Sequence, residues 1–404
     1  MKVINGGICA AKGFRAAGIW CGIRKNKSKN DLALIVSDTM CAAAGVYTKN
    51  KVKGAPIEVT KAHIADGYAQ AVICNSGNAN TCAPNGVRLA EETCALAAKA
   101  LGLKTEDIVV ASTGVIGQEM SLEPFETGIP PLVKKLSADG SAEAAGAIMT
   151  TDTQLKEYAV EFPIGNKTCR IGAIAKGSGM IHPNMATMLC FLTTDAAVSP
   201  AMLQKALSAQ VTDSFNQVSV DRDTSTNDTA VILANGLAGN AEITAEGESF
   251  DAFSAALGAV MQHMAYCLAA DGEGASKTII CKVAGAPDKT IARAVSKSII
   301  SSNLFKAAMF GEDANWGRIL CAIGYTDAEF DISKVCVSLA SAAGRVDVCE
   351  NAAYHPFAEE FAAKVLAERE ITVLVDLRQG SAEATAWGCD LTYDYVKING
   401  DYRT

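Results

Sequence analysis

The chain has 404 residues, which is more than one ordinary hydrophobic core organises, so we expect two lobes. Hydrophobic residues make up 49% of it and charged residues 20%, the composition of a soluble globular protein. The net charge of -8 argues against a nucleic-acid-binding surface. The opening MKVINGG has no apolar signal core, so the expected location is cytoplasmic.

The cysteines and histidines do not have the sequence spacing of metal ligands. The 14 cysteines form no CxxC pair and mostly lie in apolar runs, as Cys74, Cys190 and Cys281 do. This spread favours reduced, buried thiols over a disulfide framework. The four histidines include no i, i+4 pair, so we predict no metal site.

The first half of the chain mixes strands, helices and small-residue turns. Branched apolar runs predict strands over 32–38 and 70–77, and 107–117 is a strand running into a Gly-rich turn. Helical spacing predicts helices over 87–102 and 121–136, the second broken or kinked at Pro130-Pro131. Alternation over 157–175 predicts a hairpin.

The second half alternates more regularly. Ser199-Pro200 begins a helix, and strands are predicted over 229–235, 278–285, 335–340, 345–350, 371–378 and 389–400. Helices are predicted over 289–311, 356–370 and the uncharged stretch 252–270. That stretch is long enough to span a membrane, but Gln262 and His263 at its middle favour a buried helix. Alternating strands and helices with hairpins indicate α/β layers around a mixed sheet.

The stretch 176–196, KGSGMIHPNMATMLCFLTTDA, stands apart from these elements. Small residues and the Pro183-Asn184 pair predict a tight turn, and an apolar run after Thr187 predicts a buried strand. A hydroxyl at the first position of a buried strand is usually structural, so the local pattern alone favours no catalysis at Thr187.

The whole stretch, however, closely resembles the self-cleavage site of the ornithine acetyltransferases, the glutamate N-acetyltransferases of arginine biosynthesis. The resemblance extends along essentially the entire chain, through KGFRAAG, NSGNANTC, DTSTNDT and GEDANWGRI. Two departures are Ala11, where the family has Pro, and Arg222, where it has Gly in a tight turn.

The resemblance implies that the chain cuts itself between Ala186 and Thr187. The products would be an N-terminal alpha chain, 1–186, and a C-terminal beta chain, 187–404, which begins with the nucleophile. The implied fold is a mixed-sheet layered sandwich of the DmpA/ornithine-acetyltransferase type with two lobes. The implied assembly is a heterotetramer of two alpha and two beta chains.

Self-cleavage would give Thr187 the base that its hydroxyl needs. A threonine hydroxyl is too weakly acidic to attack an amide unaided. The α-amine of a chain's first residue has a pKa of about 7.7–8.0, which suits a general base. In the family, the oxyanion of such a reaction is held by a Ser-Thr-Gly turn, which falls here on the Thr113 hydroxyl and the Gly114 N–H. Without the resemblance, this turn is an ordinary strand end.

Five further residues match the positions that bind substrate in the family, where the acetylated Thr187 also holds the transferred group. They are Thr150 in MTTDT, Lys176 in KGSGM, Glu273 in DGEGA, and Asn399 and Thr404 in the ING…T ending. Taken singly, each has an ordinary explanation as a solvated side chain, a helix end or a loose tail. Their joint match favours binding.

The implied reaction moves acetyl from N2-acetyl-L-ornithine to L-glutamate by a ping-pong route through acetyl-Thr187. No cofactor is expected, and the sequence leaves open whether acetyl-CoA also serves as donor. No nucleic-acid or membrane partner is expected. One alternative is an N-terminal-nucleophile aminopeptidase or amidase of the same fold, whose members carry Ser at the cleavage point. Another is a catalytically inactive binding or scaffold protein that stays uncut.

Overall fold

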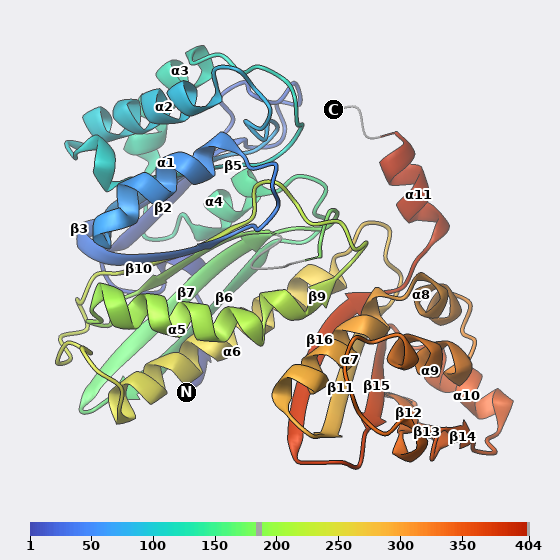
Figure 1. The fold of residues 1–404 in the computed structure, drawn as a ribbon. Helices are drawn as coiled ribbons and strands as arrows, with labels where there is room; N and C mark the ends of the chain where they lie inside the picture. The colour runs from blue at the N-terminus through green and yellow to red at the C-terminus, as the bar shows by residue number, and fades with distance from the viewer. Residues whose placement is uncertain (183–187, 402–404) are drawn as a thin grey trace.

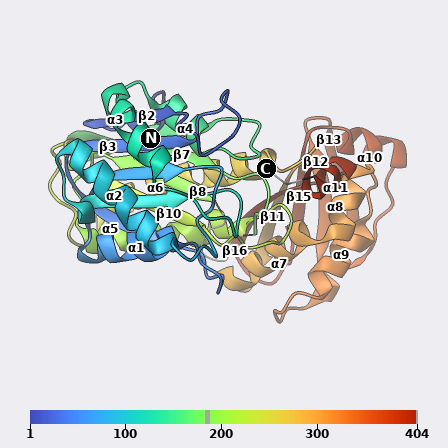
Figure 2. The same ribbon diagram turned by 90° about the horizontal axis from the view of Figure 1, so that it is seen from above.

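The computed structural model describes residues 1–182 and 188–401, and these residues form two mixed sheets. Two lobes lie side by side, a larger one built mainly from the first two thirds of the chain and a smaller C-terminal one (Figures 1 and 2). The predicted α/β class, mixed sheets and two lobes are confirmed.

The strands, in chain order, have the following bounds: β1 Lys2–Ile4, β2 Phe14–Ile19, β3 Leu32–Tyr47, β4 Tyr68–Asn75, β5 Ile108–Ser112, β6 Lys156–Ile164, β7 Lys167–Lys176, β8 Leu189–Thr194, β9 Val218–Ser219, β10 Thr229–Ala234, β11 Thr278–Ala286, β12 Cys336–Ser341, β13 Gly344–Glu350, β14 Ala353–Tyr354, β15 Glu370–Asp376 and β16 Ala382–Cys389. The α-helices are α1 Ala55–His63, α2 Gly86–Leu101, α3 Glu123–Lys135, α4 Ser141–Ile148, α5 Pro200–Thr212, α6 Glu248–Ala270, α7 Lys289–Ser301, α8 Asn303–Phe310, α9 Trp316–Gly324, α10 Glu359–Leu366 and α11 Tyr393–Gly400.

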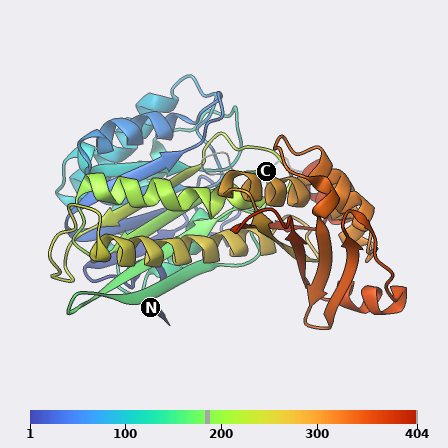
Figure 3. The same ribbon diagram turned by 60° about the horizontal axis from the view of Figure 1, so that its bottom comes forward.

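The larger lobe is a layered sandwich. Its sheet runs β1-β6-β7-β8-β10-β3-β4-β5, with β2 paired to β3. One apolar cluster joins α4 to strands from both halves of this sheet, a second packs α1, α2 and α3 on β3, β4 and β5, and a third packs α5 and α6 on β6, β7, β8 and β10. Figures 1 and 3 show α5 and α6 side by side across one outer face.

The smaller lobe is a sheet covered on one face. Its order is β14-β13-β12-β15-β11-β16-β9, and α7, α8, α9 and α10 supply the apolar residues that pack on it. The lobes are packed together, since Trp387 and Cys389 of β16 belong to the same apolar cluster as α5 and α6.

The long uncharged helix is confirmed as α6. By length and composition alone it could cross a membrane, but its apolar residues are used inside the protein. Phe253, Leu257, Val260, Met264 and Leu268, the predicted apolar face, are all fully buried. A helix that buries this face needs no lipid.

Two predictions about the C-terminal and Pro-containing segments are wrong. Residues 389–400 do not continue as strand, because β16 ends at Cys389 and α11 follows. The Thr392 hydroxyl caps that helix by accepting the Tyr395 N–H at 3.3 Å. The predicted break at Pro130-Pro131 does not occur either, since α3 continues to Lys135, and a kink there stays a prediction. Its buried face packs against α2 and the sheet and holds the helix despite the lost donors.

Other boundaries differ in smaller ways. The predicted hairpin over 157–175 is confirmed as β6 and β7. The helix predicted over 289–311 divides into α7 and α8 at Ser302, whose hydroxyl caps α8 by accepting the Phe305 N–H. The sequence analysis predicts no helix at α1, α4 or α9, which are each nine residues long or shorter.

The pairing of β7 with β8 fixes where the predicted cleavage segment begins and ends. These strands are antiparallel, and Lys176, the last residue of β7, lies opposite Leu189, the first residue of β8. The chain therefore leaves the sheet and returns to it at the same place. Ala186 and Thr187 lie outside the described residues, so the predicted cut and its two chains stay predictions.

Candidate active site

One cavity of about 320 Å³ brings together six of the predicted site residues. They come from five separate segments of the chain: Thr113 and Gly114 follow β5, Thr150 follows α4, Lys176 ends β7, Glu273 follows α6 and Asn399 lies in α11. Thr187 and Thr404 lie outside the described residues. The predicted grouping of distant residues is therefore found for each one that the structure describes.

The turn after β5 presents two hydrogen-bond donors to this cavity. Gly114 has φ +134°, and a side chain there would overlap the backbone of Gly77, so the turn requires glycine. Among the described residues, the Gly114 N–H donates no hydrogen bond. Lys176 Nζ donates to Thr113 Oγ1 at 3.4 Å, which leaves the threonine hydroxyl hydrogen available.

Lys176 is a buried cation, with 7% of its surface exposed. Burial lowers the pKa of its ammonium, the Asp152 carboxylate opposes that shift, and Lys156 adds to it. Burial would raise the pKa of Asp152, but Lys176 and Lys156 outweigh it and hold that pKa below its usual range. Asp152 is therefore a carboxylate facing two lysines.

Glu273 supplies the opposite charge in the same cavity. Its carboxylate accepts a hydrogen bond from Asn399 Nδ2 at 2.8 Å and lies against the backbone of Gly179. Any side chain at position 179 would overlap this carboxylate. The second glycine of KGSGM thus makes room for Glu273.

The C-terminal helix reaches the cavity through polar contacts. None of the residues of α11 is buried, but Thr392 Oγ1 donates to Gly274 O at 2.7 Å and the Tyr395 hydroxyl donates to Asp221 Oδ2 at 3.3 Å. Together with the Asn399 contact to Glu273, these bonds hold the helix beside the site. The ordinary explanation of Asn399 as part of a loose tail does not fit these contacts.

The segment DTSTNDT supports the Gly-rich turn, a role that the sequence did not reveal. Asn227 Nδ2 donates to Ser112 O at 2.9 Å and to Ala79 O at 2.5 Å, which fixes the end of β5. Arg222, where the family resemblance leads us to expect Gly, has φ +71°. The Arg222 backbone is therefore in the left-handed region, which glycine adopts at a lower conformational energy.

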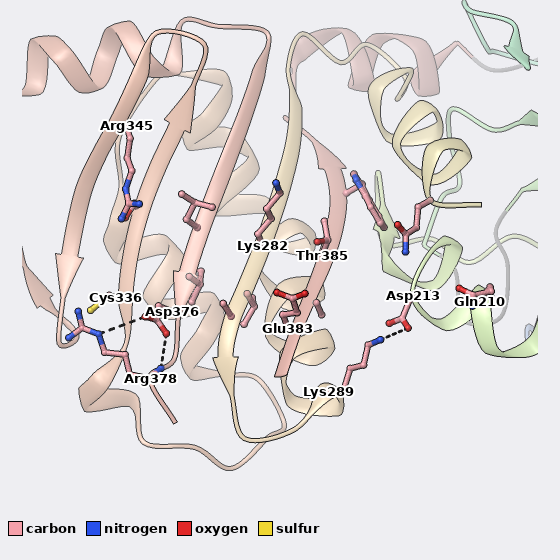
Figure 4. Close-up of a pocket in the computed structure, with 18 residues that line it drawn as sticks. Gln210, Asp213, Lys282, Lys289, Cys336, Arg345, Asp376, Arg378, Glu383 and Thr385 are labelled. Carbon is pink, nitrogen blue, oxygen red and sulfur yellow. Dashed lines mark hydrogen bonds and ion pairs between the residues drawn. The ribbon is translucent and has the colours of Figure 1, made fainter. Parts of the chain in front are cut away.

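A second cavity, of about 880 Å³, lies on the open face of the smaller sheet (Figure 4). Lys282, Arg345 and Thr385 extend from that face, and Lys289 pairs with Asp213 at 2.7 Å. None of the predicted site residues lines it. A polar sheet face with paired charges is ordinary solvated surface.

Within residues 1–182 and 188–401, no group of three or more His, Cys, Asp or Glu side chains is placed to hold a metal ion. All 14 cysteines are free thiols, and eight of them are buried, as predicted.

Comparison with known proteins places this chain in a family. A model described as the ArgJ family matches residues 15–404. The chain belongs to the ArgJ family. The arginine biosynthesis bifunctional protein ArgJ of Symbiobacterium thermophilum is 51% identical over the whole of both chains, and that of Caldanaerobacter subterraneus subsp. tengcongensis is 48% identical over the whole of both. A crystal structure of ArgJ from Bacillus halodurans matches 52% of this chain and 97% of its own, at 41% identity and a TM-score of 0.49. This ArgJ-family member is thus an enzyme of arginine biosynthesis.

Gly179→Ala tests the contact between KGSGM and Glu273. The added methyl group would displace the Glu273 carboxylate, so we expect substrate affinity to fall by about tenfold, the usual effect of losing one charge-assisted hydrogen bond. Titration with L-ornithine measures it. Gly324→Ala is the matched control, because a methyl group there meets nothing within 4 Å. Equal affinity in both variants would contradict the close approach.

Proposed function

We propose that this enzyme transfers acetyl from N2-acetyl-L-ornithine to L-glutamate through an acetyl-Thr187 intermediate, after cutting itself between Ala186 and Thr187. The observation that carries the proposal is the single cavity in which a buried lysine, a buried glutamate and the Thr113-Gly114 turn meet. Such a cavity suits a small zwitterionic amino acid and a carbonyl that develops negative charge.

Self-cleavage creates the catalyst. Thr187 Oγ attacks the Ala186 carbonyl, the acyl group moves from nitrogen to oxygen as the amine takes up a proton, and water hydrolyses the resulting ester. The products are the Ala186 carboxylate and a free α-amine on Thr187. That amine then acts as base for its own hydroxyl when the hydroxyl attacks N-acetylornithine. L-Ornithine leaves, and glutamate takes the acetyl group in the second half-reaction.

The described residues have assigned roles in this scheme. Thr113 Oγ1 and the Gly114 N–H stabilise the oxyanion in both acyl transfers. Lys176 neutralises the substrate α-carboxylate, Thr150 hydrogen-bonds it, and Glu273 with Asn399 receives the amino group. Thr404 completes the binding set in this proposal.

Three finer points belong to the same proposal. Acetyl-CoA is a second acetyl donor to Thr187, because the related proteins are named bifunctional. The cleaved chains stay together as an αβ pair, and two pairs form a heterotetramer. The free thiols fit a reducing compartment, so the proposed location is the cytoplasm.

The acceptor dependence of acetate release tests the reaction. Incubated with N-acetylornithine and glutamate, the enzyme should form ornithine and N-acetylglutamate in equal amounts. Without glutamate, turnover should stop after about one acetyl group per active site, as a ping-pong route requires. Mass spectrometry of the beta chain measures the bound acetyl group. Sustained release of free acetate without an acceptor would instead identify the amidase alternative.

The state of the chain on a denaturing gel tests the cleavage. Wild-type protein should give fragments 1–186 and 187–404, with Thr187 as the second N-terminus. Thr187→Ala should give one full-length chain, because the attacking hydroxyl is gone. A Thr187→Ala chain cut at the same bond would show that an external protease acts there, and a wild-type chain that stays intact would favour the scaffold alternative.

Thr113→Val tests the oxyanion site. Valine keeps the shape of threonine and removes the hydroxyl, and losing one such donor costs about a hundredfold or more in kcat. The rate of acetyl-enzyme formation at saturating N-acetylornithine measures it on cleaved protein. Thr151→Val, a neighbouring cavity threonine with no assigned role, is the control. A rate near that of wild type would remove Thr113 from the mechanism.

A further inference from the structure

Lys156 is a buried cation close to the substrate cavity that does not line it. It is the first residue of β6 and is 2% exposed. Its Nζ lies 2.7 Å from Asp152 Oδ1 and 2.5 Å from Asp271 Oδ2. One ammonium group thus bridges two buried carboxylates that lie far apart in the sequence.

The first carboxylate holds two of the segments that bind substrate. Asp152 accepts the N–H of Thr150 at 3.0 Å and the N–H of Gly177 at 2.6 Å. Gly177 directly follows Lys176 at the end of β7. The position of Asp152 therefore determines the position of the loop that contains Thr150. It also determines the position of the backbone next to Lys176.

The second carboxylate holds the segment that carries Glu273. Asp271 accepts the N–H of Thr153 at 3.1 Å, and its main-chain carbonyl accepts the Ser178 hydroxyl at 2.6 Å. The N–H of Glu273 in turn donates to Ser178 O at 3.0 Å. Through Asp271, Lys156 is linked to the loop that places the acidic side chain of the cavity.

Stability alone is a weak explanation for such a triad. Burying three charges costs desolvation that their attraction only partly repays. The Lys156 ammonium keeps the Asp152 and Asp271 carboxylates close together, because without a cation between them the two carboxylates would repel each other. Removing it should separate the Asp152 side of the cavity, with Thr150 and Lys176, from the Asp271 side, with Glu273.

We propose that Lys156 is a positioning residue for substrate binding: it holds the cationic and anionic sides of the cavity at the spacing that a zwitterionic amino acid requires. This inference rests on the proposed function. Lys156 performs no proton transfer in it and acts through Asp152 and Asp271.

The test compares Lys156→Met, which keeps length and removes charge, with Lys156→Arg, which keeps charge. Isothermal titration with L-ornithine measures affinity and needs neither cleavage nor chemistry. We expect the dissociation constant to rise by about tenfold or more in Lys156→Met and to recover largely in Lys156→Arg. The limiting rate of acetyl-enzyme formation on cleaved protein should change by less than about threefold.

The matched control is Lys277→Met, another buried lysine, whose Nζ lies 3.0 Å from Glu312 and 2.7 Å from Leu366 O in the smaller lobe. It should lower the melting temperature and leave ornithine affinity unchanged. If both methionine variants weaken affinity equally, the effect of Lys156 is general destabilisation and the proposal fails.

A second variant covers the case in which Lys156→Met does not fold. Asp271→Asn leaves the Lys156–Asp152 pair charge-balanced and weakens the link between Lys156 and the Glu273 loop. It also replaces the charged acceptor of the Thr153 and Gln154 N–H groups, so affinity should still fall. Unchanged affinity in either folded variant overturns the positioning role while wild-type binding and turnover stand. Wild-type protein that neither binds ornithine nor forms acetyl-enzyme would instead contradict the proposed function.

Discussion

The antiparallel pairing of β7 with β8 is the constraint on which the rest of the site depends. It sets Lys176 opposite Leu189, so the chain leaves the sheet and returns to it at the same end of these two strands. On the other side of β8, Thr229 N donates to Met188 O at 2.9 Å, which ties the residue after Thr187 to the start of β10. Met188 and Leu189 are thereby held between β7 and β10, beside Lys176.

The same pairing explains how a cut chain could remain one protein. β8 lies between β7, from the proposed alpha chain, and β10, from the proposed beta chain, while β10 pairs along its length with β3 of the alpha chain. Main-chain hydrogen bonds therefore join the two fragments at two places in the centre of the sheet. Cleavage would free two termini without opening the core, because every strand pairing within residues 1–182 and 188–401 involves residues outside the cut bond.

The opposite charges of Lys176 and Glu273 have to be held at fixed positions in one small cavity. Lys176 and Glu273 are both buried, and an unpaired buried charge is costly, so the site must hold partners ready for each. In the proposed arrangement, the ion pairs of Lys156 with Asp152 and Asp271 hold the backbone around the cavity, and α11 lies beside it. Substrate charges would complete pairs that the folded chain has already positioned, which is how binding energy is directed to orientation.

Much of this protein was determined by local sequence. The hairpin β6–β7, the helix α6 and the strand leading into the Thr113-Gly114 turn follow from periodicity and turn residues that act within a few positions. The site motifs MTTDT, KGSGM and DGEGA were also recognisable in the sequence, and the structure brings their described residues into one cavity.

Features that depend on contacts between distant segments became visible only in the tertiary structure. Nothing in the local sequence around Lys156 indicates that it bridges Asp152 and Asp271, since the second partner is 115 positions away. The sequence predicts a strand over 389–400, but the helix found there is capped by Thr392 and held by Gly274, Asp221 and Glu273. Hydrogen bonds to distant segments override local preference there, because an exposed helix of eight residues has too few internal contacts to be stable alone.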